Sequence, residues 1–282
     1  MRVVFHGVRG SVPAPGPSTV RYGGNTSCVE VRLADGALIV LDAGTGIRGL
    51  GGALLRERFA GPVNLMLSHT HWDHVLGLPF FGPLWLKQTH LVVHPLASDA
   101  QERFQRTIFD DIHFPVSAAD IPARIEFARP ESDSWRVGSA TVRRIALNHP
   151  GASQGFRIDD DDGSSFAYLT DNELTAPAKI VTTLDELARF TEGVGLLVHD
   201  SQYVHGDMPA KRGWGHSVID EVLELGAKAL PGTLALFHHD PDRSDSDLDA
   251  IGDRSREWMQ SRSARVEVIV AHEGLALEPR AR

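Results

Sequence analysis

The stretch 65-LMLSHTHWDHVLG-77 places three histidines and one aspartate within six positions, directly behind an apolar run with the pattern of a buried strand. The four side chains are His69, His71, Asp73 and His74. Imidazole and carboxylate groups are ordinary ligands of divalent metal ions. The stretch therefore predicts a metal-binding turn at the end of a core strand.

The same arrangement recurs along the chain, because five predicted strands end in a residue of ligand type. The residues that follow these strands are His69 to His74 after Val63–Leu67, His149 after Thr141–Leu147, Asp171 after Ser165–Leu169, His199 and Asp200 after Gly195–Val198, and His238 and His239 after Thr233–Phe237. In layered α/β folds neighbouring strand ends form one rim, where ligands and catalytic groups gather. We therefore expect these side chains to converge.

The spacing inside the motif favours two metal ions over one. His69 and His71 are two residues apart in extended chain, so their side chains leave on the same side. Asp73 and His74 follow as the chain turns into a helix, where adjacent side chains diverge. A second ion needs further ligands and a carboxylate that touches both ions, and His238 and Asp171 are the candidates. We prefer His238 to His239 because it follows Phe237 directly.

Composition limits the other readings of the chain. The 282 residues carry a net charge of −9, which argues against general affinity for nucleic acid backbones. The single cysteine, Cys28, excludes an internal disulfide and a thiolate-rich zinc site. The amino-terminal run lacks a signal-peptide core, and no apolar stretch reaches the roughly 18 residues of a membrane span. The expectation is a cytoplasmic protein without membrane contact.

Short β-branched runs alternate with amphipathic segments, which is the α/β pattern. Asp-Gly turns at 34–37 and 159–163 predict antiparallel hairpins, so mixed sheets are expected, in one domain over residues 1–282. The other predicted strands are Arg2–Phe5, Ser27–Leu33, Ala37–Leu41, His90–His94 and Val266–Val270, and the predicted helices are Ala97–Asp110, Leu184–Thr191, Val218–Ala229 and Leu248–Gln260.

A phosphodiester substrate would add a requirement outside the metal shell. Two ions roughly 3.5–4 Å apart hold a shared water as hydroxide and clamp phosphate oxygens. The leaving alkoxide then needs an acid, and His216 fits, with Asp200 as the carboxylate that orients it. Ser217 and Asp220 have the spacing of a capping box, which would put His216 just before a helix N-terminus. His199 would face away from this site as a packed residue.

Several segments resemble one known family. The HTHWDH segment resembles the HxHxDH signature of metallo-β-lactamase-fold hydrolases, and His149, Asp171 and His238 follow in the family's ligand order. The segments 196-LLVHDSQY-203 and 213-GWGHSVID-220 are similar to the HEAT and HST motifs of the ribonuclease Z and phosphodiesterase branch. The opening GVRGSVPAPG and YGGNTSCV segments resemble that branch's glycine-rich loop and strand.

This resemblance implies a four-layer αβ/βα sandwich of two mixed sheets with a dinuclear site at its edge. It places His69, His71 and His149 on one metal and Asp73, His74 and His238 on the other, with Asp171 bridging. The predicted catalytic set is Asp73, His216 and Asp200. Asp42 resembles the family's buried aspartate behind the metal loop. Phosphodiesterases of this branch are often dimers, so the resemblance leaves a homodimer as one possible state, which the sequence does not decide.

The expected substrate size follows from one difference between this sequence and the ribonuclease Z branch. Enzymes that process transfer RNA carry a long basic arm between the third-histidine motif and the bridging aspartate, but only 22 positions separate His149 from Asp171. A small phosphodiester such as a cyclic nucleotide is therefore preferred to a large RNA. Lactone, lactam or thioester hydrolysis on the same metals stays open, as do a silent binding module and an iron-dependent sulfur oxidoreductase. Zinc is the default pair of ions, and manganese or iron also suits these ligands.

Overall fold

Two seven-stranded mixed sheets form the centre of the protein, and the computed structural model describes residues 1–94, 108–109, 114–176, 180–262 and 265–280. The first sheet contains, in spatial order, β14 (Ala276–Leu277), β1 (Arg2–Gly7), β2 (Cys28–Arg32), β3 (Leu38–Leu41), β4 (Val63–Met66), β5 (His90–His94) and β6 (Arg124–Phe127). The second contains β13 (Glu267–Val270), β12 (Thr233–Phe237), β11 (Leu196–Asp200), β10 (Ser165–Leu169), β9 (Ser153–Asp160), β8 (Ala140–Leu147) and β7 (Ser134–Val137).

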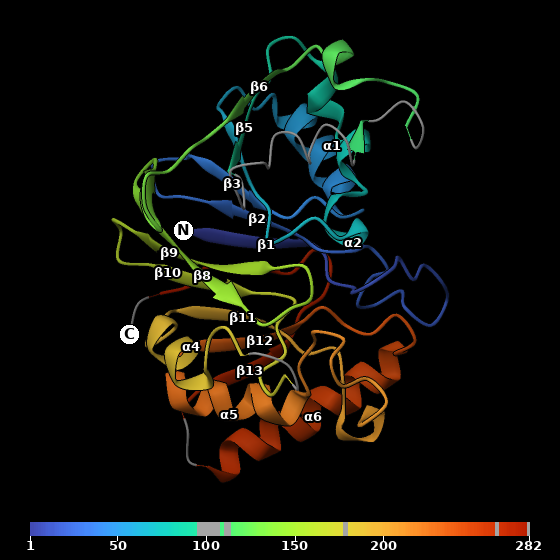
Figure 1. Cartoon of the computed structure of the whole chain (residues 1–282), viewed down its shortest axis with the longest axis vertical. Helices are drawn as coiled ribbons and strands as arrows, with labels where there is room; N and C mark the ends of the chain where they lie inside the picture. The colour runs from blue at the N-terminus through green and yellow to red at the C-terminus, as the bar shows by residue number, and fades with distance from the viewer. Residues whose placement is uncertain (95–107, 110–113, 177–179, 263–264, 281–282) are drawn as a thin grey trace.

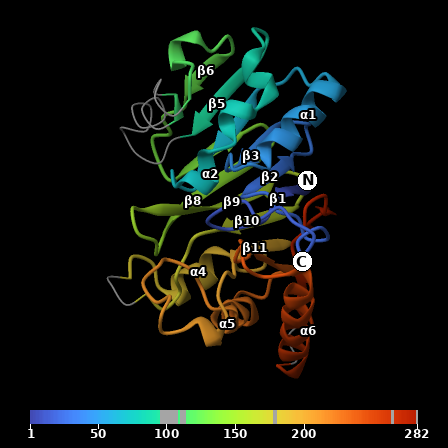
Figure 2. The same cartoon turned by 90° about the vertical axis from the view of Figure 1, so that its right-hand side faces the viewer.

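Helices cover the outer face of each sheet, so the protein has four layers (Figures 1 and 2). The first sheet carries α1 (Ile47–Glu57), α2 (Trp72–Val75) and the 3-10 turns η1 (Leu78–Phe80) and η2 (Gly82–Trp85). The second carries α4 (Leu184–Phe190), α5 (Ile219–Ala229) and α6 (Asp245–Ser261). The short turns η3 (Ala118–Asp120) and η4 (His205–Asp207) lie in connections. The predicted αβ/βα sandwich is confirmed.

Three hydrophobic layers hold the four structural layers together. In β3, Ile39 and Leu41 join the cluster between the two sheets, whereas Leu38 and Val40 join the cluster under α1. In β12 the same alternation sends Phe237 to the cluster between the sheets and Leu236 to the cluster under α5 and α6. Both faces of these strands are buried, which explains why the strands are continuous apolar runs with no polar alternation.

The strand directions explain why the ligand-type residues meet. Strand β9 is antiparallel to both β8 and β10, and β10, β11 and β12 are mutually parallel. The strands β8, β10, β11 and β12 therefore run in one direction, and their carboxyl ends lie at one edge of the second sheet. Strand β4 brings the 69–74 motif to the same edge from the first sheet (Figure 1).

Each predicted strand is present with ends shifted by at most two residues, and the two hairpin turns are confirmed by the β2–β3 and β9–β10 pairs. Five elements of the structure were not among the predicted strands and helices, namely α1, β6, β7, β9 and β14. Helix α1 has three glycines, which lower helix propensity, and it forms because Ile47, Leu50 and Leu54 pack on the first sheet. The predicted helix Ala97–Asp110 falls almost wholly outside the described residues. Within the described part of the chain, no helix combines the length and apolarity needed to cross a membrane.

Candidate metal centre

Seven side chains from both sheets form two donor groups. In each group every member offers one ligand atom, and these atoms lie within 4.8 Å of one another. We call the first the outer group, made up of His69, His71, His149 and Asp171. We call the second the inner group, made up of Asp73, His74, Asp171 and His238. The structure thus brings together all seven residues that the sequence analysis selected as ligands.

Local backbone geometry explains how the short segment 69–74 supplies side chains to both donor groups. His71 has extended backbone (φ −63, ψ 154) and is the N-cap of α2, while Asp73 and His74 lie on the helix itself. The rings of His69 and His71 meet edge to face with centroids 4.4 Å apart. His74 instead stacks against His238, at 5.3 Å.

Asp171 presents a different oxygen to each group. Its Oδ1 lies 3.1 Å from Nε2 of His74 and 3.2 Å from Nε2 of His238. Its Oδ2 lies 3.6 Å from Nε2 of His69 and 3.7 Å from Nε2 of His149. Asp171 also has a positive φ of 48°, as do Asp42 and His238 at 60°. Three non-glycine residues held in this costly conformation at strand ends indicate a site that the surrounding packing fixes in place.

Hydrogen bonds to groups outside the donor groups orient three of the histidines so that their Nε2 atoms face inward. The Nδ1 atoms bond outward, that of His74 to Asp42 Oδ2 at 2.8 Å, that of His238 to Gln202 Oε1 at 3.0 Å and that of His149 to the Gly215 carbonyl at 2.9 Å. An imidazole that donates at Nδ1 binds an ion through Nε2 once that nitrogen carries no proton. The Nε2 atoms of His74 and His238 are only 3.3 Å apart, and buried His69 Nε2 has no hydrogen-bond partner. This donor set fits divalent metal ions.

The two donor groups differ in the charge of their side chains. Burial alone would raise the pKa of Asp171, yet His238 and His74 hold that pKa well below its usual value. Burial opposes protonation of His74, but the surrounding carboxylates, Asp171 first, raise its pKa well above the usual range. In the outer group, burial lowers the pKa of His69 and of His149. The inner group is therefore a charge-paired cluster, whereas His69 and His149 are neutral imidazoles.

His216 lies beside the inner group and bonds to Asp200. Its Nδ1 donates to Asp200 Oδ2 at 2.8 Å, and its ring stacks on His238 with centroids 5.0 Å apart. Burial would lower its pKa, but Asp200 raises the pKa to about 9. The ring edge of Tyr203 packs against His216 at 5.6 Å. Although Asp200, His216 and His238 also lie close enough to hold an ion, Asp200 already accepts from the backbone of Asn172 and Gln202.

The neighbouring histidines His199 and His239 face away from the donor groups. His199 is buried, with Nδ1 on the Asp200 carbonyl at 2.6 Å and Nε2 near the Asn172 amide at 3.2 Å. The Nε2 of His239 donates to the Ala271 carbonyl at 2.8 Å, and burial lowers its pKa to about 3. His238, and not His239, is the residue that joins the inner group.

The predicted capping box at Ser217 and Asp220 is wrong. The N-cap of α5 is Val218, which makes no side-chain cap, and the helix begins at Ile219. The Ser217 hydroxyl donates to the Asn172 carbonyl at 2.5 Å and accepts from the Leu174 backbone at 3.3 Å. Because this contact with the loop after β10 occupies Ser217, the serine connects two site loops and does not cap the helix.

Several supporting residues escaped the sequence analysis. Ser68 donates to Asp42 and contacts His69 Nδ1 at 3.0 Å. Tyr168 donates its hydroxyl to Asp42 Oδ2 at 2.8 Å, and Ser11 donates its backbone N–H to Asp73 Oδ2 at 2.8 Å. The Ser11–Asp73 contact joins residues 62 positions apart in the sequence, and the Tyr168–Asp42 contact joins residues 126 positions apart. Ser11, Ser68 and Gln202 lie inside the quoted motifs, so a local signal existed for them, whereas Tyr168 lay only in a predicted strand.

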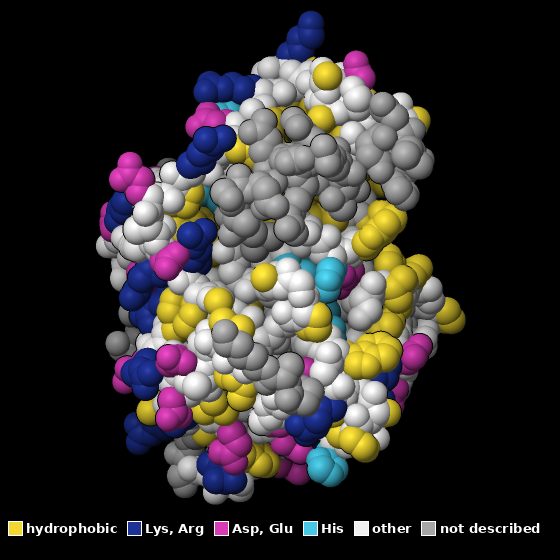
Figure 3. Space-filling model, in the orientation of Figure 1, with side chains coloured by type: hydrophobic (Ala, Val, Ile, Leu, Met, Phe, Trp, Pro, Cys, Tyr) yellow, Lys and Arg dark blue, Asp and Glu magenta, His cyan; other side chains and the backbone are white. Residues whose placement is uncertain are grey.

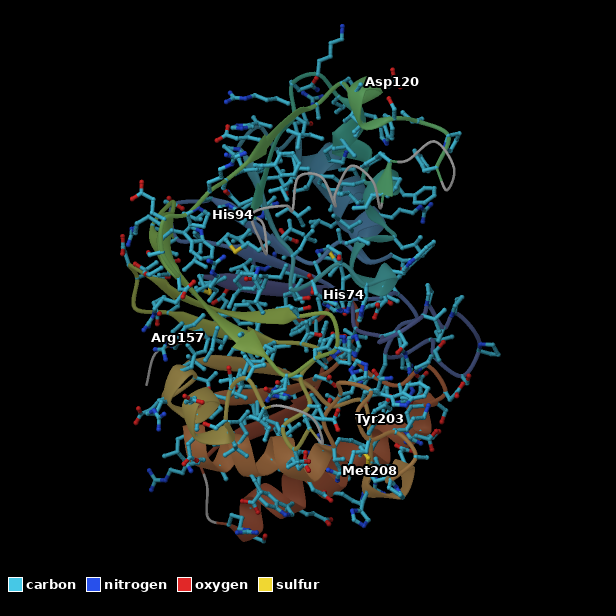
Figure 4. The ribbon with its side chains drawn as sticks, viewed as in Figure 1. His74, His94, Asp120, Arg157, Tyr203 and Met208 are labelled. Atoms are coloured by element: carbon cyan, nitrogen blue, oxygen red, sulfur yellow. The ribbon has the colours of Figure 1, made fainter. Side chains whose placement is uncertain are left out.

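The centre opens toward solvent on one face. Figure 3 shows histidine side chains at the surface near the middle of this face, with hydrophobic side chains beside them. Trp72 and Trp214, close in sequence to the ligands and to His216, are both exposed. Phe81 and Phe109 are instead buried in the core under α1, so most aromatics after the motif do not line the site. Figure 4 shows His74 deep between the two halves and Tyr203 below it.

A four-layer αβ/βα sandwich with histidine and aspartate donor groups where its strands end defines the class of metallo-β-lactamase-fold, metal-dependent hydrolases. The chain belongs to the beta-lactamase superfamily, since the family model described as beta-lactamase superfamily domain matches residues 38–239.

Curated and solved proteins extend the comparison over the whole chain. A ribonuclease Z of Haloarcula marismortui is 24% identical over 319 residues, which cover 98% of this chain and 96% of that protein. The metallo-beta-lactamase fold protein YhfI from Bacillus subtilis superposes with a TM-score of 0.71 at 19% identity, covering 98% of each chain. A diphosphatase from the PhnP family gives a TM-score of 0.68 at 19% identity, covering 99% of this chain and 98% of that one.

Proposed function

We propose that this protein is a dinuclear metal-dependent phosphodiesterase that hydrolyses a small phosphodiester such as a cyclic nucleotide. One observation carries the proposal. Asp171 turns one oxygen to each donor group, and the hydrogen-bonded His216–Asp200 pair lies directly beside the inner group. Two cation positions and an adjacent proton donor suit phosphodiester cleavage, because the ions can clamp the phosphate oxygens while the donor protonates the leaving group.

The ligand assignment follows the two groups. His69, His71 and His149 would hold one ion, the inner group would hold the other, and Asp171 would contact both. When bound, such ions neutralise phosphate oxygens and activate water for attack. Zinc is the default ion for this imidazole and carboxylate donor set, which manganese or iron also accept.

His216 would be the general acid. Because its Nδ1 is bonded to Asp200, the transferable proton is at Nε2, and a pKa of about 9 keeps the ring protonated at neutral pH. Protonation of the leaving alkoxide is the step that this proton serves. Asp73 completes the predicted catalytic set, with its Oδ2 oriented by the Ser11 amide and by His238.

The small size of the substrate is supported by the segment between His149 and Asp171. This segment consists of the β9–β10 hairpin, whose strands pair in the second sheet. The net charge of −9 also disfavours a long polyanion. Ribonuclease Z and the PhnP-family diphosphatase are named for cleavage of phosphate linkages, which supports the reaction class. Ribonuclease Z is named for a macromolecular substrate, so the size of this protein's substrate must be tested directly.

The test is turnover of the zinc-loaded protein on a 3′,5′-cyclic nucleotide, on bis-p-nitrophenyl phosphate and on a structured RNA. We expect His216→Ala to retain both ions and to lose about 10²- to 10⁴-fold in kcat on the cyclic nucleotide. His205→Ala, which removes an exposed histidine of η4, is the matched control and should keep full activity. Undiminished turnover of His216→Ala would remove His216 from the mechanism.

The same substrate panel separates the alternatives. An acyl hydrolase would ignore phosphodiesters and open a lactone or thioester. A binding module would leave every substrate intact while retaining metal. One iron per chain by metal analysis would favour the sulfur oxidoreductase. Faster cleavage of RNA than of the cyclic nucleotide would contradict the small-substrate part of the proposal.

A further inference from the structure

Glu173 is a buried carboxylate that the proposed chemistry does not use. It follows Asp171 by two residues, is only 3% exposed, and in the part of the chain that the structure describes it pairs with no lysine, arginine or histidine. Its oxygens accept from the backbone N–H of Gly213 at 2.9 and 3.1 Å, and from that of Gly215 at 3.0 Å. A carboxylate is costly to bury unless several donors compensate it, and here the donors come from one short loop.

The loop 213–215 has few other anchors. Gly213 and Gly215 have left-handed φ values of 86° and 90°, which disfavour any side chain. Trp214, between them, is 58% exposed, so burial of its ring does little to hold the loop. The Glu173 carboxylate therefore sets the direction of the peptide groups on both sides of Trp214.

Those peptide groups touch two residues of the site. The Gly215 carbonyl accepts from His149 Nδ1 at 2.9 Å, and a Cβ on Gly215 would come within 2.2 Å of that same Nδ1. His216 follows Gly215 directly, so its imidazole moves with the loop. The backbone N–H of Glu173 donates to the Asn148 carbonyl at 2.8 Å, beside His149. Glu173 thus joins the segment before one metal ligand to the loop before the acid.

We propose that Glu173 is a positioning residue that clamps the 213–215 loop and so orients both His216 and His149. Its part in acid catalysis rests on the proposed function, whereas its part in orienting His149 does not. The clamp acts through two neutral backbone donors, so the pattern of acceptors matters more than the charge. Glu173→Gln preserves size but replaces one acceptor oxygen with an NH₂ group that would oppose a backbone N–H.

The control is another buried carboxylate that accepts from two backbone N–H groups, Asp245 at the start of α6, which unlike Glu173 also lies 3.8 Å from the Arg21 side chain. Asp245 is buried and accepts from the backbone N–H of Arg21 at 2.8 Å and of Tyr22 at 3.2 Å. Asp245→Asn makes the same chemical change and should leave zinc binding and kcat at wild-type values. Both variants are compared by melting temperature in metal-free form. If Glu173→Gln does not fold, Glu173→Asp, which keeps the charge and shortens the reach, replaces it under the same criteria.

The first measurement uses no turnover. Zinc affinity is measured by competition with a chelator. We expect Glu173→Gln to lower the affinity for one of the two ions by about 10-fold or more, because His149 loses the acceptor that orients its ring. The second ion should be unaffected. Wild-type affinity for both ions in Glu173→Gln would overturn the inference.

The second measurement uses aryl methyl phosphates whose leaving phenols differ in acidity, with zinc at saturation. Loss of a positioned acid should slow a phenol leaving group by about 10- to 100-fold in kcat, and a nitrophenol leaving group far less, with KM unchanged. Glu173→Gln should lower kcat much more for the phenol than for the nitrophenol leaving group. Adding Glu173→Gln to His216→Ala should lower kcat no further. An equal loss on both leaving groups would overturn the inference.

The two measurements separate failure of the clamp from failure of the proposed function. If the wild-type protein cleaves no phosphodiester, the proposed function fails and the zinc measurement alone decides the role of Glu173. If His216→Ala lacks the leaving-group dependence, the acid assignment fails, and again zinc affinity decides. If His216→Ala shows the dependence and Glu173→Gln does not, the proposed function stands and the clamp is refuted.

Discussion

In the outer donor group His71 is exposed, whereas every member of the inner group is buried. The residues behind them differ as well. His74 of the inner group donates to the carboxylate of Asp42, while His149 of the outer group donates to a backbone carbonyl. A carboxylate partner makes an imidazole a stronger ligand than a neutral carbonyl does. We infer that the inner position is built to retain an ion and the outer position to meet solvent and substrate.

Asp42 shows how far the support of the inner group extends. It follows β3 and accepts from Tyr168 of the other sheet at 2.8 Å and from the Ser68 backbone at 2.7 Å. The inner group is therefore tied to the cores of both sheets. Such partners fix ring orientation and raise affinity for metal.

The largest effect should come from the residue that the two groups share. Asp171→Ala removes an acceptor from both groups, so we expect loss of both ions and a fall in turnover of about 10³-fold or more. Metal content by mass spectrometry, with turnover on the same sample, measures this. Loss of only one ion would show that Asp171 belongs to one group alone.

The next effect should be confined to the inner group. Asp42→Asn keeps a residue type that tolerates the positive φ of 60° at this position but removes the charge that faces His74. We expect the inner ion to bind about 10- to 100-fold more weakly, with the outer ion unchanged. Tyr168→Phe, which removes one donor to Asp42, is the milder matched change. Equal weakening of both ions by Asp42→Asn would contradict the distinction between the groups.

Acidity should also separate the groups. Since the pKa of His74 is raised, this ring is protonated at neutral pH and an inner ion must displace its proton. The pKa values of His69 and His149 are lowered, so those rings are already neutral. Between pH 7 and 8 we expect inner affinity to rise about 10-fold and outer affinity to change little. Calorimetry in buffers of different ionisation enthalpy counts the released proton, and proton release on outer loading would argue against this assignment.

The smallest effect tests the register of β12. His239→Gln should change zinc affinity by less than about twofold and lower the free energy of unfolding by about 1 kcal/mol, because its ring bonds to Ala271 outside the centre. His238→Gln should instead release the inner ion. Zinc titration with chemical denaturation of both variants makes the comparison. The reverse pattern would mean that His239 is the ligand.

The sequence was informative where periodicity and residue type agree. Continuous apolar runs such as those at β3 and β12 are buried on both faces, so their strands were predictable. Polar β9 and glycine-containing α1 were missed because local preference opposes the structure that packing selects. The capping box failed because Ser217 had a better partner in Asn172. The single domain over residues 1–282 stays a prediction.

The amino-acid sequence by itself determined which strands end in ligand residues, because an apolar run followed directly by histidine or aspartate is a local pattern. It also determined that His69 and His71 leave one extended segment while Asp73 and His74 leave a turn of helix. Only the tertiary structure decided that Asp171 turns one oxygen to each group and that Glu173 holds the loop before His216. The physical reason is that these contacts join distant segments, and their geometry exists only once the two sheets have packed together.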